Sequence, residues 1–198
     1  MTLSEFRPLV LLSVTDPKET ARRIVTLNLP PNALVTAFLL VLVLNTLVFQ
    51  LGQIVAPTPV PRELAMVVGN PGAFIALLGA SMAAMALALT WTGQMMGGAG
   101  RLSDLAALIV WLQALRVLAQ AGLLVIIPVS AVLGGVALMA ISALGIWIAI
   151  NFVDAAHAFN NLFKSAFVLI FGALGMAIAV TIVLALLGIA PNGMPANV

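Results

Sequence analysis

The chain has 198 residues, of which 63% are hydrophobic and 7% are charged, and its mean hydropathy is +1.23. An ordinary soluble domain has about 25% charged residues, so this composition excludes a soluble globule and predicts a surface that faces lipid. The net charge of +2 gives no reason to expect nucleic-acid binding, and the lack of cysteine excludes disulfides and cysteine-based metal sites.

Residues 1–32 are expected to form a cytoplasmic segment that carries one amphipathic helix. Asp16, Pro17 and Glu19 are typical of a helix start. Asp16 accepts bonds from first-turn amides, Pro17 suits the first helical position, and Glu19 is expected to reach back in a capping box. The sequence therefore predicts a helix over about 17–29.

The two sides of this predicted helix differ in chemistry. The apolar side holds Ala21, Ile24, Val25 and Leu29, and the basic side holds Lys18, Arg22 and Arg23. Glu19 stands four residues before Arg23, which is the favourable order for an ion pair. Two interpretations stay open: an in-plane helix held on anionic lipid at the cytoplasmic face, or a surface that docks a partner.

Five apolar stretches follow that are long enough to cross a membrane, since a helix needs about 20 residues to span about 30 Å of hydrocarbon. We therefore predict an all-α fold, a polytopic integral membrane bundle over 33–190, followed by a short tail at 191–198. The predicted spans are about 33–55, 72–93, 104–126, 129–152 and 166–189.

The break between the third and fourth spans is the least marked, because only residues 127–130 separate them. Pro128 is expected to end the third span, since proline cannot donate a backbone hydrogen bond and disfavours helix at the preceding residue. The other connectors are rich in proline or glycine, at 56–61, 70–72 and 97–100.

Arg116 is the one basic residue expected within the bilayer. Gln113 and Gln120 lie three residues before it and four after it, on the same helical face, and Asn45 of the first span can turn toward the same interior. An intramembrane arginine is a functional candidate. The stripe serves either helix packing and assembly or a site for an anion or substrate.

A second polar face closes the fourth span: Asn151, Asp154, His157, Asn161 and Lys164. A hydrolytic triad needs a nucleophile and a metal site needs three or four ligands, whereas Asp154 and His157 supply two groups at most. We predict a solvated helix end with a capped or paired histidine. No catalytic residue, metal ligand or cofactor site is expected.

Small residues on the second, fourth and fifth spans permit close helix approach. They are expected to pack within the chain, and a homodimer stays open as the alternative. The glycines concerned are Gly79, Gly134, Gly135, Gly172 and Gly175.

Several short motifs resemble the Yip1-domain membrane family, in its bacterial type: Asp16-Pro17-Lys18-Glu19-Thr20, the stretch 97–101, and a Trp147-containing span that leads into 154–157. The resemblance covers about residues 16–190. It implies an integral membrane protein that is involved in membrane organisation or trafficking. Eukaryotic members look like adaptors for small GTPases. Their Asp-Leu-Tyr-Gly-Pro motif is absent here and the chain has no tyrosine, so only the fold is carried over.

The function that follows is a non-enzymatic one. We expect a multi-pass protein of the bacterial cytoplasmic (inner) membrane, or of an internal membrane continuous with it. It acts by association, in membrane organisation or as an adaptor or accessory subunit of a larger membrane complex. The alternative is a small transporter or channel that uses Arg116, Gln113 and Gln120.

The distribution of basic residues predicts an N-inside, C-outside orientation. With the N-terminus inside, six of the eight Lys and Arg residues are cytoplasmic, Arg62 is outside and Arg116 is in the bilayer. Alkaline phosphatase fused after Val198 is therefore expected to be active, because that enzyme works only outside the cytoplasm. A fusion partner that is active only in the cytoplasm contradicts the orientation if it works at this position.

Overall fold

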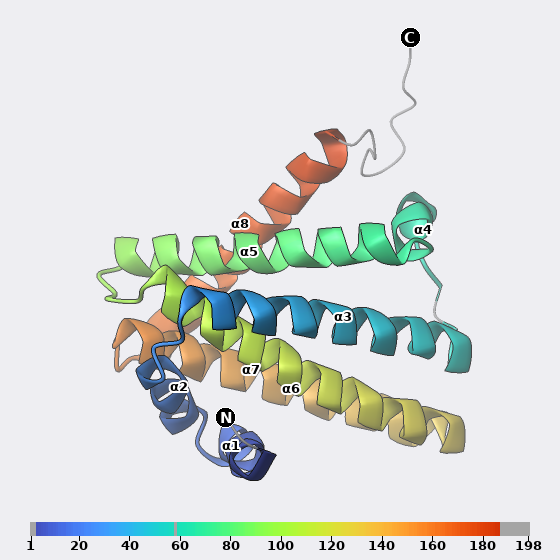
Figure 1. Cartoon of the computed structure of the whole chain (residues 1–198), viewed down its shortest axis with the longest axis horizontal. Helices are drawn as coiled ribbons and strands as arrows, with labels where there is room; N and C mark the ends of the chain where they lie inside the picture. Colours follow the sequence, from blue (N-terminus) through green and yellow to red (C-terminus); the bar gives the residue numbers. More distant parts are fainter. Residues whose placement is uncertain (1–2, 58, 187–198) are drawn as a thin grey trace.

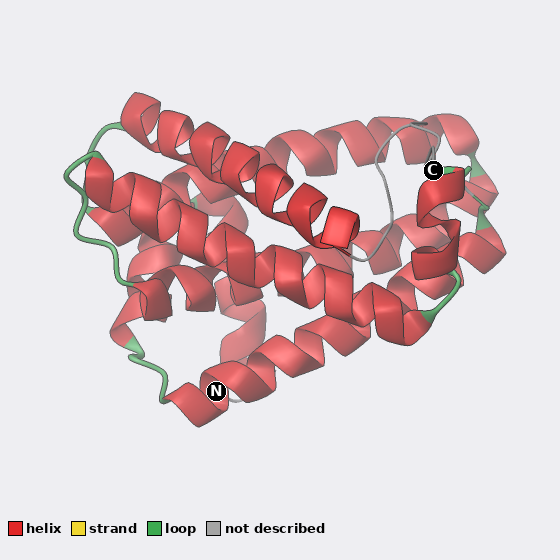
Figure 2. Cartoon of the chain, turned by 90° about the horizontal axis from the view of Figure 1, so that it is seen from above, coloured by secondary structure: helices red, strands yellow, loops and turns green. Residues whose placement is uncertain are grey.

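The computed structural model describes residues 3–57 and 59–186, and every regular element in that part is an α-helix (Figures 1 and 2). The helices are α1 (Leu3–Thr15), α2 (Pro17–Thr26), α3 (Pro31–Val55), α4 (Arg62–Val68), α5 (Pro71–Met95), α6 (Leu102–Val129), α7 (Ala131–His157) and α8 (Leu162–Leu186). The all-helical prediction is confirmed. The predicted tail at 191–198 and the last residues of the predicted fifth span lie outside the described residues.

Five of these helices are long and apolar enough to cross a membrane: α3, α5, α6, α7 and α8. The longest, α6, has 28 residues and therefore runs for about 42 Å, while the hydrocarbon layer is about 30 Å thick. The five long apolar helices are thus confirmed, and α6 is about 12 Å longer than the hydrocarbon layer is thick.

The break between α6 and α7 lies at Ser130, and the prediction that Pro128 ends the third span is wrong. Helix α6 continues through Pro128 to Val129, and only the hydrogen bond that a proline N–H cannot make is lost. Ser130 has extended backbone angles, and its hydroxyl accepts the Leu133 N–H at 3.3 Å to cap α7.

The start of α2 is as predicted, and its end is not. The Asp16 carboxylate accepts the Glu19 N–H at 2.9 Å. Glu19 does not close a capping box, because its carboxylate accepts a bond from Arg23 at 2.9 Å, the pairing that the spacing predicts. The helix ends at Thr26, before Asn28 takes a left-handed conformation with φ of +42°.

The helices alternate in direction, so the chain returns repeatedly to the same end of the bundle. Helix α2 lies across the end at which α3, α6 and α8 begin and α5 and α7 finish, and α4 lies at the opposite end (Figure 1). We call the first of these the α2 end. The N-terminal segment and the loops before α6 and α8 therefore share one end, as a five-span topology requires.

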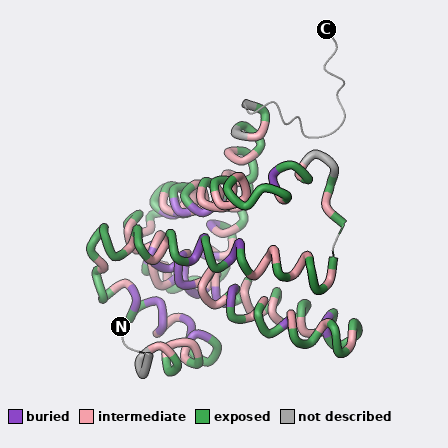
Figure 3. Tube along the Cα trace, turned by 45° about the vertical axis from the view of Figure 1, so that its right-hand side comes forward, coloured by how far each residue is buried: buried purple, intermediate pink, exposed green. Residues whose placement is uncertain are grey.

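Burial is concentrated near the α2 end, in α2 and the adjacent halves of α6 and α7 (Figure 3). The outer faces of α3 and α8 are exposed and apolar, as expected of surfaces in contact with lipid. On α8 these residues are Phe163, Phe167, Ile170, Phe171, Leu174, Ile178 and Ile182.

Close packing of α8 on α5 depends on glycine. A Cβ at Gly172 would overlap the side chain of Leu89, and a Cβ at Gly175 would lie 3.3 Å from that of Ala88. Gly79 similarly faces Leu42, with 3.1 Å between a built Cβ and the leucine Cδ1. These small residues are used within the chain, as the sequence predicts.

Gly172→Ala is expected to destabilise the bundle by about 1–3 kcal/mol, because buried Leu89 has to move to admit the methyl group. Thermal unfolding in detergent micelles measures the effect. Gly135→Ala is the matched control, since a Cβ there meets nothing within 4 Å. Equal stability of the two variants would contradict the proposed close packing.

Candidate functional site

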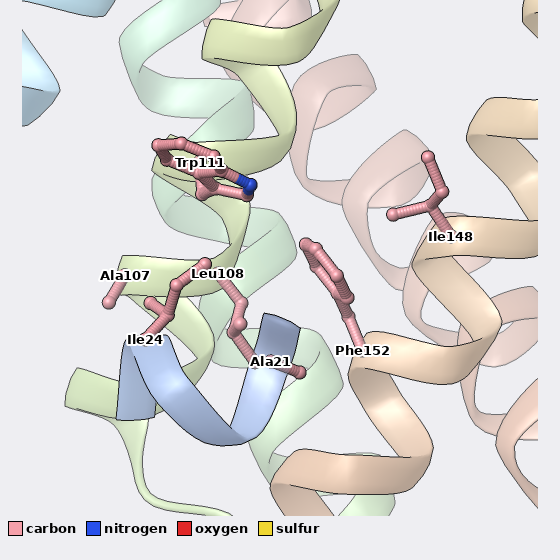
Figure 4. Packing of buried hydrophobic residues seen from close by; sticks show 7 residues of the cluster. All are labelled: Ala21, Ile24, Ala107, Leu108, Trp111, Ile148 and Phe152. Carbon is pink, nitrogen blue, oxygen red and sulfur yellow. The ribbon is translucent and has the colours of Figure 1, made fainter. Parts of the chain in front are cut away.

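The apolar side of α2 packs on the bundle. Ala21 and Ile24 are buried against α6 and α7 in a cluster with Ala107, Leu108, Trp111, Ile148 and Phe152 (Figure 4). The side chains of Arg22 and Arg23 remain exposed. The side of the helix that was expected to rest on lipid or on a partner therefore contacts the chain itself, and only the outer side is available to other molecules.

Helix α1 was not predicted, and it is tied to the same region through Trp111. The indole N–H donates to the hydroxyl of Ser13 at 2.9 Å, and the ring of Phe6 lies edge-on at a centroid distance of 5.4 Å. Ser13 is fully buried and in turn donates to the Leu9 carbonyl. These contacts hold α1 beside α6, about a third of the way along that helix.

An ion pair fastens α2 to the end of α7. The Lys18 ammonium lies 2.5 Å from Oδ2 of Asp154, whose side chain is fully buried. Oδ1 of the same carboxylate accepts the Asn161 N–H at 2.8 Å and the Ser165 hydroxyl at 3.1 Å. Lys18 also donates to the amide oxygen of Asn160 at 3.1 Å. We call these five residues the Asp154 cluster.

His157 sits in a cradle of backbone. Its Nδ1 accepts the Gly100 N–H at 3.1 Å, and its Nε2 lies 3.2 Å from the Leu89 carbonyl. This pairing assigns the neutral tautomer with the proton on Nε2, which donates to that carbonyl. A Cβ at Gly93, Gly98 or Gly100 would overlap the imidazole. The ring thus joins α5 and the loop before α6 to the end of α7.

The prediction of a solvated helix end is therefore wrong, while the prediction of a paired histidine is confirmed. Asp154 and His157 are 0% and 2% exposed. The remaining polar residues are engaged locally: Asn151 donates to the Trp147 carbonyl, and the Lys164 ammonium lies 4.6 Å from the centre of the Phe159 ring.

At this end of the bundle, Asp154 and His157 serve to hold neighbouring helices together. Both oxygens of Asp154 and both ring nitrogens of His157 have partners, and neither side chain reaches solvent. Within residues 3–57 and 59–186, no three His, Asp or Glu side chains converge as metal ligands would.

The predicted polar stripe lines a groove between α1, α6 and α7. Gln113, Arg116 and Gln120 all line this groove, which has a volume of about 610 Å³. Gln113 and Arg116 also line a smaller cavity of about 310 Å³ between α5, α6, α7 and α8. Arg116 is exposed and has no hydrogen bond or ion pair to any described residue. Asn45 does not line the groove, and its amide donates to the Val41 carbonyl within α3.

Comparison with known proteins identifies one family. The family model described as Yip1 domain matches residues 11–188. No significant match was found among curated proteins or among solved structures. The match spans the α2 helix, the Asp154 cluster and all five long helices.

Lys18→Met is expected to lower the free energy of unfolding by about 2–3 kcal/mol, because it leaves a buried carboxylate without a cation. Arg23→Met is the matched control on the same helix. It removes an exposed pair and is expected to cost less than about 0.5 kcal/mol. Denaturant unfolding in micelles, followed by tryptophan fluorescence, measures both. Similar reductions in the free energy of unfolding would show that the Lys18–Asp154 pair stabilises the protein no more than the exposed Arg23–Glu19 pair does.

Proposed function

The chain belongs to the Yip1 domain family, and from this premise we propose that it works by association in the membrane, as an adaptor or accessory subunit of a larger membrane complex. The observation that carries the proposal is the fixed position of α2. Its inner side is held by the hydrophobic cluster and by Lys18, while Arg22, Arg23 and Leu27 stay exposed on its outer side. A surface held rigid in advance loses little conformational entropy on binding.

The position of the polar groups favours association over catalysis and over transport. The groups suited to acid–base chemistry, Asp154 and His157, are buried and engaged. A transport path needs a continuous polar route. Apart from Arg116, Gln113 and Gln120, the groove beside α1 has one polar lining residue, Ser142.

The proposed setting is the bacterial cytoplasmic membrane, with the α2 end inside. There the exposed arginines of α2 face the cytoplasm and the anionic lipid surface beside it. A companion protein that docks on this side would carry acidic residues opposite Arg22 and Arg23. We propose a second membrane protein in that role, with a homodimer as the competing outcome.

Mild extraction of a C-terminally tagged copy from its native membrane, followed by size-exclusion chromatography and mass spectrometry, tests the proposal. A companion at a near-integer ratio is expected. Arg22→Glu is expected to reduce its recovery about tenfold, since charge reversal at an interface costs more than about 1.4 kcal/mol.

Arg101→Glu is the matched control, because Arg101 is also exposed and lies at the same end of the bundle but belongs to the loop before α6 and not to α2. It is expected to retain the companion. Recovery of the chain alone, as a monomer or homodimer, would contradict an accessory role. Equal loss in both variants would show that total charge matters and the α2 surface does not.

A further inference from the structure

We infer that the groove between α1, α6 and α7 binds one anionic phospholipid, with the phosphate on Arg116 and an acyl chain along the apolar wall. We call this hollow the Arg116 groove. It has a volume of about 610 Å³, and its apolar lining includes Val10, Val14, Leu123, Leu138 and Ile148. The inference goes beyond the proposed function and needs no protein companion.

The groove contains one positive charge, that of Arg116. Lys18 pairs with Asp154 and Arg23 pairs with Glu19, whereas Arg116 has no partner among the described residues. Arg116 differs from the exposed arginines of α2 because it lies within a membrane-spanning helix and lines an apolar groove. No acidic side chain lines the groove. A guanidinium in an apolar setting needs an anion, and phosphate matches its paired donors well.

A second unsatisfied group lies one helical turn away. The Oε1 atom of Gln113 is buried and accepts no hydrogen bond in the described part of the chain. A buried acceptor of this kind is costly unless a donor reaches it. A phospholipid with a hydroxyl or ammonium in its headgroup brings such a donor together with the phosphate.

The position of Arg116 along α6 places it below the polar layer of the membrane but within reach of it. Helix α2, with exposed Arg22 and Arg23, packs beside Ala107 and Leu108 of α6, so that level belongs to the polar layer of the membrane. Arg116 lies eight residues beyond Leu108, which is about 12 Å deeper. A long basic side chain at that depth extends back toward the phosphates and shortens this distance.

The shape of the groove matches an amphiphile. From Arg116 the lining continues for seven residues along α6 to Leu123, about 10 Å farther into the hydrocarbon. On α7 it follows the same direction from Ile148 to Leu138. A free anion would leave this apolar wall uncovered, whereas the acyl chain of a lipid covers it. The occupant is therefore a lipid of the surrounding bilayer.

Native mass spectrometry of the full chain in detergent micelles tests the inference. The chain is mixed with phosphatidylglycerol or with phosphatidylcholine that has the same acyl chains. We expect one retained phosphatidylglycerol, with occupancy about tenfold above that of phosphatidylcholine, as a charge-assisted bond implies. Arg116→Gln is expected to abolish the preference, and Arg116→Lys to keep most of it. Arg101→Gln controls for loss of a positive charge elsewhere.

A second pair of variants tests the groove without touching the charge. Gly145 lines the groove and Gly135 lies outside it on the same helix, and a Cβ at either position meets nothing within 4 Å. Gly145→Leu is expected to reduce lipid retention about tenfold, and Gly135→Leu to leave it unchanged. The inference is overturned if Arg116→Gln and Gly145→Leu retain phosphatidylglycerol as the unaltered chain does, or if phosphatidylcholine binds equally well.

Discussion

The ion pair between Lys18 and Asp154 is the interaction on which the α2 end depends. A fully buried carboxylate is tolerated only with a cation and with donors for its remaining lone pairs, and Lys18, Asn161 and Ser165 supply them. Because the cation comes from α2 and the anion from α7, satisfying the charge also places α2 across the bundle. That placement covers Leu108 and Phe152 and decides which side of α2 remains outside.

Helix length explains where such polar groups can be accommodated. Helix α7 has 27 residues and measures about 40 Å, about 10 Å more than the hydrocarbon requires. Asp154 and His157 lie in its last turn, within this surplus. Arg116, by contrast, lies well inside α6 and has no such shelter. The two polar sites therefore differ: the charge of Asp154 is paired within the protein, whereas Arg116 is exposed in a groove and has no partner among the described residues.

Local patterns in the sequence account for what could be predicted, and contacts between distant residues account for what could not. Hydropathy identifies the five long helices, and spacing of three or four residues identifies the Asp16 cap and the Glu19 to Arg23 pair. The Asp154 cluster and the His157 cradle join residues more than fifty positions apart. Nothing in the local sequence distinguishes Lys18 from its basic neighbours, and the same is true of the glycines around His157. Helix α1 escaped prediction because its contacts with Trp111 are equally remote.

The distance along the chain between Lys18 and Asp154 also sets an order of assembly. The two residues are 136 positions apart, so at 5–20 residues per second the ribosome completes the second partner on the order of 10 s after the first. Until Asp154 is made, the Lys18 ammonium has no carboxylate to pair with, and the apolar side of α2 lacks the α7 part of its cluster, Ile148 and Phe152. The membrane surface is the first environment that can accept both, so we expect the newly made helix to rest on lipid. We expect it to move onto the bundle only after the fourth span, which carries Asp154, has been inserted.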